Sequence, residues 1–131
     1  MNTFYKLSVI SSLFLLVSYA NGAQDVPACH RVNTVPEDYR LMVHRANFSI
    51  THSIQLGMNQ TCILTLGEED GNIWKAPGVD LIDLGNRKYQ ITNRSHESLI
   101  YVTDPTSYVA PGFESYIGFT GAHGRAIVVH T

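Results

Sequence analysis

The segment from Phe48 to Leu56 alternates strictly between two kinds of side chain. Hydroxyl or amide groups occupy every second position, and the positions between them are apolar or imidazole side chains: Phe48, Ile50, His52, Ile54 and Leu56. Successive side chains of a strand point to opposite faces of a sheet, so this period of two predicts a strand with one buried face. We therefore expect a β-rich fold in which His52 lies on the apolar face.

Further strands are predicted where short apolar or β-branched runs are bounded by glycine, proline or asparagine. These runs are Cys62–Leu66, Val79–Leu84, Lys88–Thr92, Leu99–Thr103, Ser115–Thr120 and Ala126–His130. Gly85-Asn86 and Gly121 to Gly124 are expected to form hairpin-type turns. The acidic segment Gly67 to Gly71 is interpreted as a solvated turn at the end of a strand.

One helix is predicted before these strands. Thr34-Val35-Pro36-Glu37 has the order of a capping box, with threonine at the N-cap and glutamate three residues later. The apolar side chains that follow recur at helical spacing, which predicts a helix over about residues 35–46. The expected fold class is therefore α+β and β-dominated: one short N-terminal helix followed by an antiparallel sheet. An all-β sandwich is the alternative.

The first residues have the features of an export signal. Lys6 precedes the apolar run Leu7 to Val17, and small residues follow at Ser18, Ala20 and Gly22. That run is too short to span a bilayer, and its order is typical of a cleaved secretory signal peptide. We expect residues 1–22 to be the signal and residues 23–131 to form a single secreted, extracellular domain without a membrane anchor.

The exported route sets expectations for the cysteines and asparagines. Cys29 and Cys62 are the two cysteines of the chain, and an oxidising compartment predicts a disulfide between them. Three Asn-x-Ser/Thr sequons predict glycosylation at Asn47, Asn59 and Asn93.

Charge and motifs exclude several function classes. The chain has a formal net charge of −2 with no basic stripe, so its electrostatics do not favour nucleic acid as a partner. Its six histidines show neither His-x-His nor His-Glu-x-x-His spacing, and the sequence has no nucleophile elbow and no phosphate-binding glycine loop. We expect no metal, no cofactor, no catalytic residue and a monomeric chain.

Aromatic side chains gather in the C-terminal third. Tyr108 and Phe113 lie in a loop bounded by Pro105 and Pro111, where aromatic side chains often serve recognition. Trp74 fits either a core anchor or a binding face. Trp74, Tyr108 and Phe113 are therefore the predicted binding residues.

The segment Ile117 to Gly124, with Ile127-Val128-Val129 and Thr131 after it, resembles the C-terminal hairpin of small secreted fungal guanyl-specific ribonucleases. That resemblance implies one helix and an antiparallel sheet that holds the active site. The chain departs from it at the catalytic positions, because Phe119 stands where the family has its acid histidine. Trp74 to Pro77 also offers no carboxylate for the family's base, and His130 stands where the family has a cysteine.

These departures imply a ribonuclease-like fold without its catalytic pair, as in effector proteins of plant-pathogenic fungi. Those effectors often carry an aromatic-x-Cys motif, which Pro27-Ala28-Cys29 does not match. In outline the chain also resembles the ToxB-like small β-sandwich effectors, which commonly have one early disulfide.

The predicted function is that of a secreted, non-catalytic binding protein of the effector type, whose partner is a protein or another host macromolecule. One alternative is a ribonuclease-type phosphodiesterase that uses His52 and His123 with Arg87 or Arg94. Such an enzyme requires these groups to meet across one cleft. The other alternative is a structural cell-wall or matrix protein.

Overall fold

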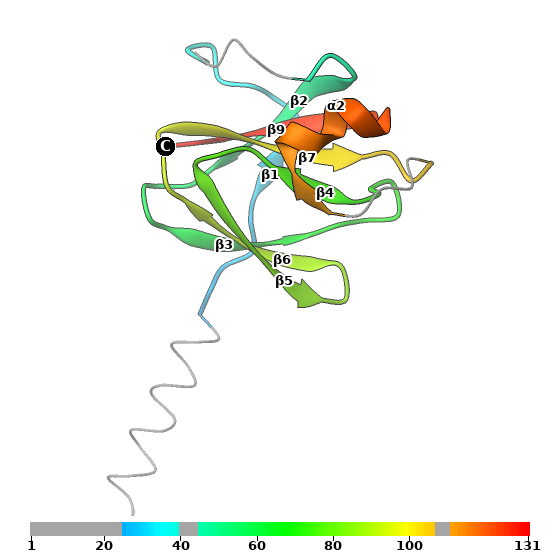
Figure 1. Ribbon diagram of the computed structural model, residues 1–131. Helices are drawn as coiled ribbons and strands as arrows, with labels where there is room; N and C mark the ends of the chain where they lie inside the picture. Colours follow the sequence, from blue (N-terminus) through cyan, green and yellow to red (C-terminus); the bar gives the residue numbers. More distant parts are fainter. Residues whose placement is uncertain (1–24, 40–44, 107–110) are drawn as a thin grey trace, which may run out of the picture.

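The computed structural model of this chain describes residues 25–39, 45–106 and 111–131, which form two β-sheets (Figure 1). The larger sheet has six strands in the order β1-β2-β9-β7-β4-β8, and the smaller one has three in the order β3-β6-β5. The larger sheet comprises β1 (Arg31–Val32), β2 (Phe48–Gln55), β9 (Gly124–His130), β7 (Glu97–Thr103), β4 (Ile73–Lys75) and β8 (Gly112–Phe113). The smaller sheet comprises β3 (Thr61–Thr65), β6 (Lys88–Asn93) and β5 (Val79–Gly85).

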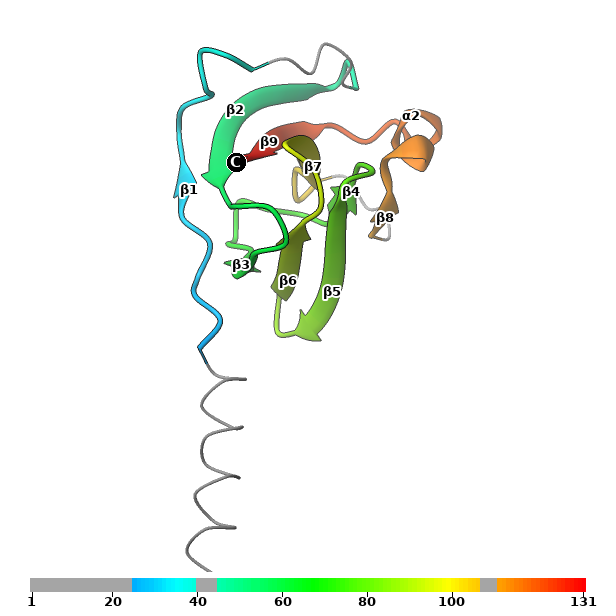
Figure 2. The same cartoon turned by 90° about the vertical axis from the view of Figure 1, so that its left-hand side faces the viewer.

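The two sheets pack face to face, with the smaller sheet below the larger one in Figure 2. Alternate residues of both sheets fill the space between them, and we call this cluster the inner core. Its fully buried members include Ile54, Ile73, Ile91, Ile100 and Ile127. The side chains on the opposite face of the larger sheet do not reach the inner core and pack against other parts of the chain.

These side chains form a second hydrophobic cluster on the outer face of the larger sheet, which we call the outer core. Phe48, Leu99, Tyr101 and Val128 project into it from β2, β7 and β9. Val35 and Tyr39 pack against it from the connection before β2, and Ile117 packs against it from the segment before β9. The larger sheet is thus apolar on both faces, which explains why β9 reads as a nearly continuous hydrophobic run.

The prediction of an N-terminal helix is wrong for the residues between β1 and β2 that the structure describes. Residues 35–39 form an extended segment and one turn, in which Tyr39 N donates to Pro36 O at 3.1 Å, and residues 45–47 form a second turn. Residues 40–44 of the predicted helix lie outside the described part of the chain. Packing of Val35 and Tyr39 on the sheet outweighs the helical pattern, as tertiary contacts commonly outweigh propensity.

The expected antiparallel sheet is also corrected. β2 pairs with β9 in parallel and β4 pairs with β8 in parallel, so the larger sheet is mixed, whereas the smaller sheet is antiparallel. The described residues therefore form a sandwich of a mixed sheet and an antiparallel sheet, in place of the expected α+β fold. A parallel pair such as β2 and β9 requires a long crossover connection, which the rest of the domain supplies.

The predicted strand Ser115–Thr120 is wrong as well. The chain forms a 3-10 turn η1 (Glu114–Tyr116) and one helical turn α2 (Ile117–Thr120), which Gly121 ends at a positive φ of 69°. Ile117 is buried in the outer core, and Thr120 Oγ1 donates to Ile117 O at 2.8 Å. The segment Thr120–Gly124 consequently links α2 to β9 and does not form the expected hairpin.

The strict alternation of Phe48–Leu56 conceals a β-bulge. Ile50 pairs with Ala126, but His52 pairs with the next residue, Ile127, so Thr51 is an extra residue of β2. Phe48 and Ile50 therefore face the outer core, whereas Ile54 and Leu56 belong to the inner core. One strand that reads as a single apolar stripe supplies both cores.

Deletion of Thr51 should leave the domain folded, with a loss of less than about 1.5 kcal/mol in the free energy of unfolding. The deletion joins Ile50 to His52 and keeps every other pair of the β2–β9 register, at the cost of the 2.6 Å contact between Thr51 Oγ1 and His52 Nδ1. Deletion of buried Ser53 is the control, because it exchanges the faces of Thr51 and His52 and places an imidazole opposite Val128. That control should lose about 3 kcal/mol or more in urea denaturation. Equal losses in the two variants would contradict the bulge.

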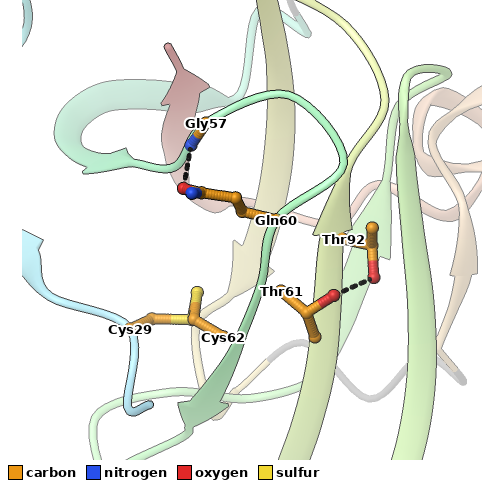
Figure 3. Close-up of a disulfide and its surroundings, with 6 residues drawn as sticks. All are labelled: Cys29, Gly57, Gln60, Thr61, Cys62 and Thr92. Atoms are coloured by element: carbon orange, nitrogen blue, oxygen red, sulfur yellow. Dashed lines mark hydrogen bonds between the residues drawn. A yellow bond between two sulfur atoms is a disulfide. The ribbon is translucent and has the colours of Figure 1, made fainter. Parts of the chain in front are cut away.

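The residues before β2 cross from one sheet to the other. Ala28 forms a parallel bridge with Ile63 of β3, and Arg31 and Val32 then pair with Ile54 and Ser53 of β2. We call residues 27–32 the N-terminal strap. The predicted disulfide between Cys29 and Cys62 is confirmed, and Figure 3 shows it joining the strap to β3. Next to it, Gln60 Oε1 accepts a hydrogen bond from Gly57 N at 3.0 Å and closes the turn between β2 and β3.

Candidate functional site

A hollow of about 230 Å³ opens at one side of the sandwich, where the edges of the two sheets meet. Lys75 comes from β4 and Phe113 from β8 of the larger sheet, and Leu81, Asp83 and Tyr89 come from β5 and β6 of the smaller sheet. We call this feature the edge hollow. Its lining is largely apolar and aromatic, with one ammonium and one carboxylate group, which is the usual composition of a recognition site.

Phe113 is a large aromatic side chain that is exposed at this edge. It is 52% exposed although its strand is paired, because β8 is the outermost strand of the larger sheet. The Lys75 ammonium lies 4.6 Å from the centre of the Phe113 ring and also donates to Val79 O at 2.8 Å. This cation–π contact and hydrogen bond hold the ring at the mouth of the hollow.

Of the other two predicted binding residues, Trp74 is 5% exposed and belongs to the outer core. It pairs with Gly112, where an added Cβ atom would lie 3.1 Å from the Trp74 ring, so the indole supports β8 from behind. Trp74 itself presents no binding surface. Tyr108 lies outside the described residues.

The edge of the smaller sheet beside the hollow is formed by β5. Arg94 N donates to Gly78 O, which places that carbonyl on the β6 side, and carbonyls alternate along a strand. The N–H and C=O groups of Leu81 and Asp83 therefore point away from β6. No other described strand pairs with that side of β5, and Ile82 and Leu84 are exposed on its outer face.

The two histidines of the ribonuclease alternative do not meet in one cleft. Gly124, next to His123, pairs with Phe48, whereas His52 pairs with Ile127, which separates the two imidazoles along the sheet. His123 Nδ1 lies 2.8 Å from Asp104 Oδ2 in an exposed turn. Burial, and then the charges of Arg31 and Arg125, lower the pKa of His52, while Asp70 opposes the shift.

The arginines of that alternative are engaged in holding turns. Arg87 donates from one guanidinium nitrogen to Gly67 O at 2.9 Å and to Asp70 O at 2.5 Å. Arg94 donates to Asp80 at 2.7 Å and to Asn59 Oδ1 at 2.9 Å. Neither guanidinium is directed to a site that contains His52 or His123, so the geometry does not favour the phosphodiesterase alternative.

The acidic turn contains a buried carboxylate, which corrects the interpretation of a solvated turn. Asp70 is 3% exposed, and its Oδ2 accepts a hydrogen bond from Gly67 N at 2.9 Å and lies 3.4 Å from Arg31 Nη1. Its Oδ1 lies 3.6 Å from Arg125 Nη2. The turn is thus bound to the N-terminal strap and to β9, and its role is structural.

The three sequons differ in their surroundings. Asn47 and Asn59 are exposed, but Asn93 is fully buried. Its Nδ2, the atom that would carry a glycan, donates to Leu56 O at 2.5 Å, and its Oδ1 accepts from Ser95 N at 3.2 Å. The folded domain therefore has room for glycans on Asn47 and Asn59 but not on Asn93.

A second concave surface lies on the outer face of the larger sheet, at the end away from Gly124. Two adjoining hollows of about 400 and 520 Å³ share Pro36, Gln55 and His130. His30 lines the first hollow, and His96 with Glu97 lines the second. We call the pair the histidine trough. Sequence reasoning missed it, because its side chains come from four stretches of the chain (residues 30–38, 53–55, 96–97 and 130–131) and show no common spacing.

Two further observations concern the described residues as a whole. They contain no group of three or more histidine, cysteine, aspartate or glutamate side chains arranged to hold a metal ion. They also contain no helix with the length and apolar character needed to cross a bilayer.

Comparison of the chain with protein-family models, curated proteins and solved structures gives no match.

Proposed function

We propose that this protein is a secreted, non-catalytic binding domain of the effector type, which recognises a protein of another organism through the edge hollow. The observation that carries the proposal is the position of Phe113. An aromatic ring that is 52% exposed stands over Lys75 at the mouth of an apolar hollow. Aromatic side chains that are held in place beside a desolvated pocket are typical centres of protein recognition.

The hollow fits a side chain of a protein partner better than a polyanion. Its charged groups are one ammonium and one carboxylate, and the ammonium is already engaged by Val79 O and the Phe113 ring. A volume of about 230 Å³ is near the lower limit for small-molecule sites but suits one large apolar side chain. A protein partner would therefore insert an aliphatic or aromatic residue between Phe113, Leu81 and Tyr89.

The free edge of β5 indicates how such a partner would dock. An extended segment could pair with the outward N–H and C=O groups of Leu81 and Asp83, as in recognition by strand addition. Alternate side chains of that segment would then reach the hollow on one face and Ile82 and Leu84 on the other. Main-chain hydrogen bonds would supply affinity, and the hollow would select the inserted side chain.

The test begins with selection of binding peptides from a displayed library of random 12-residue sequences on the purified protein. A selected peptide should bind Phe113→Ala at least about tenfold more weakly than the unaltered protein, as expected for a central aromatic contact. Met58→Ala is the matched control, because Met58 is an exposed apolar side chain on the distant turn between β2 and β3. Its affinity should not change.

Hydrogen exchange reports the mode of docking. The outward amides of Leu81 and Asp83 should become protected when the peptide binds, whereas those of Asp80 and Ile82 are already bonded to β6. Selected peptides that bind the Phe113→Ala variant equally well would contradict the use of the edge hollow. Recovery of no binding peptide, or RNA cleavage by the purified protein, would contradict the proposed function.

A further inference from the structure

The two charged groups that line the edge hollow lie at opposite ends of its β5 wall. Lys75 Nζ donates to Val79 O at 2.8 Å, at the start of β5. Asp83 lies further along the same strand and lines the same hollow. Because consecutive strand residues are about 3.3 Å apart, Val79 and Asp83 are separated by about 13 Å along β5. The described lining is therefore positive at one end and negative at the other.

The Asp83 carboxylate is exposed and keeps its capacity for a cationic partner. Its Oδ1 accepts a hydrogen bond from Gly85 N at 2.8 Å, and none of the ion pairs that join described residues includes it. Arg87, at the tip of the same hairpin, donates instead to Gly67 O and Asp70 O. Since a carboxylate has about four acceptor positions, Asp83 can accept further hydrogen bonds from a partner.

The charge of Asp83 acts on the interior of the edge hollow. Burial, and then the charge of Asp83, raise the pKa of the Tyr89 phenol, while Arg87 opposes the shift. Residues 107–110, which precede Pro111 of the lining and lie outside the described part of the chain, include no aspartate, glutamate, lysine, arginine or histidine. Those side chains therefore add no charge to the pattern that Lys75 and Asp83 set.

The part of the β5 edge that is open to pairing is short. Lys75 Nζ occupies Val79 O at one end, and the Asp83 carboxylate occupies Gly85 N at the other. The outward N–H and C=O groups between them belong to Leu81 and Asp83. An antiparallel partner exchanges both bonds with each of these residues, whereas parallel bonds are slanted and slightly weaker. The smaller sheet is antiparallel, so an antiparallel partner continues its pattern.

We propose that the partner segment lies antiparallel to β5 and carries a basic residue followed, two positions later, by a large apolar residue. This inference rests on the function proposed for the edge hollow and specifies the partner. In that direction the basic residue lies opposite Asp83 and the apolar residue opposite Leu81, and both side chains face the hollow. The basic side chain would pair with the Asp83 carboxylate, and the apolar one would enter between Phe113, Leu81 and Tyr89.

Lys75 disfavours the opposite order of the two residues. An antiparallel segment with its apolar residue opposite Leu81 and a basic residue after it would place the second cation opposite Val79, beside the Lys75 ammonium. Repulsion between like charges weakens that arrangement, and such repulsive contacts are a common source of specificity. The order of the two residues, as well as their chemical type, should therefore decide the affinity.

The experiment compares two synthetic peptides of identical composition and charge. The forward probe is acetyl-Thr-Thr-Arg-Thr-Phe-Thr-Thr-amide, and the reverse probe is acetyl-Thr-Thr-Phe-Thr-Arg-Thr-Thr-amide. Threonine favours the extended conformation in both. Binding to the purified protein is followed by NMR titration of the Leu81 and Asp83 amides. The forward probe should shift both resonances and bind about fivefold more tightly than the reverse probe, which is the effect of one exposed ion pair.

Variants of Asp83 test the charge contact. Asp83→Asn retains an oxygen that can accept from Gly85 N, and it should bind the forward probe about fivefold more weakly. Asp80→Asn is the matched control, because Asp80 lies on the other face of β5, where it pairs with Arg94 at 2.7 Å. Its affinity for the forward probe should not change. Asp83→Lys should prefer a forward probe in which glutamate replaces arginine.

Equal affinity for the two probes, or no binding of the forward probe, would overturn this inference. Tighter binding by Asp83→Asn would also overturn it, because Asp83 would then be a charge that protects the sheet edge from pairing. The Phe113→Ala variant distinguishes this failure from failure of the proposed function. If peptides selected from the library still lose affinity for Phe113→Ala, the edge hollow remains the binding site, and only the direction and charge of the partner are wrong.

Discussion

Replacement of Phe48 by alanine should lower the free energy of unfolding by about 3–5 kcal/mol, the usual cost of removing a buried phenylalanine. Phe48 is 1% exposed at the start of β2 and contacts Tyr101 edge to face, with ring centres 5.1 Å apart. Truncation would leave a cavity in the outer core and remove this ring pair. Because small domains are stable by only about 5–15 kcal/mol, a large part of the total would be lost. Urea denaturation followed by tyrosine and tryptophan fluorescence measures the change.

Two controls separate this packing effect from the loss of any aromatic ring. Phe113→Ala removes a phenylalanine that is 52% exposed and should change stability by less than about 1 kcal/mol. Phe48→Leu retains most of the buried volume and should cost less than alanine. A stability loss at Phe113 as large as that at Phe48 would contradict the assignment of Phe113 to a recognition surface.

Removal of the disulfide should have the second largest effect. The Cys29→Ser/Cys62→Ser variant opens a loop of 33 residues, and the chain-entropy model predicts a loss of about 3–4 kcal/mol. The variant also frees the N-terminal strap, which is otherwise bound to β3 through Cys29 N to Ile63 O and Ile63 N to Pro27 O, both at 2.8 Å. Guanidinium denaturation of the variant and the parent protein measures the loss.

Hydrogen exchange shows where the disulfide acts. The amide of residue 29 should exchange faster in the serine variant than in the parent protein, whereas the amides of β9 should change less, because β9 is paired on both sides. The reduced parent protein is the matched control and should behave as the serine variant does. If the serine variant loses less than about 1 kcal/mol in its free energy of unfolding, strand pairing alone holds the N-terminal strap against β3.

Much of the strand content could be predicted from local pattern, because a half-buried strand imposes its period on the sequence. Val79–Leu84, Lys88–Thr92, Leu99–Thr103 and Ala126–His130 all fall within observed strands. The strands β1, β4 and β8 have only two or three residues, too few to show a period. Each of them forms by pairing with a strand that is distant in the sequence, and that information is not local.

The wrong prediction of a helix and the missed β-bulge both result from packing between segments that are distant in the sequence. The helical pattern around Val35 and Tyr39 marks residues that contact the outer core, but a turn brings them there as well as a helix does. The bulge at Thr51 leaves no trace in the alternation, because the residues on both sides of it remain apolar at every second position. Only the register with β9 reveals that they belong to different cores.

Among the described residues that line the edge hollow, the sequence singles out only Phe113 as a binding residue. Phe113 stood out because aromatic side chains between prolines are rarely all buried. Lys75, Leu81 and Tyr89 read as ordinary strand residues, since their meeting depends on how the two sheet edges approach each other. The interpretation of a solvated turn is wrong for Asp70, because the sequence does not show that Arg31 and Arg125 converge on its carboxylate.

The position of β9 in the middle of the larger sheet affects how this protein can be made. Phe48 reaches its neighbour Gly124 only when nearly the whole domain has been synthesised, and both cores require β9: the outer one through Ala126 and Val128, the inner one through Ile127 and Val129. A chain that leaves the ribosome from its N-terminus cannot complete either core piece by piece. It would remain unfolded during synthesis, which is the state that a translocation channel accepts, and would fold in a single late step.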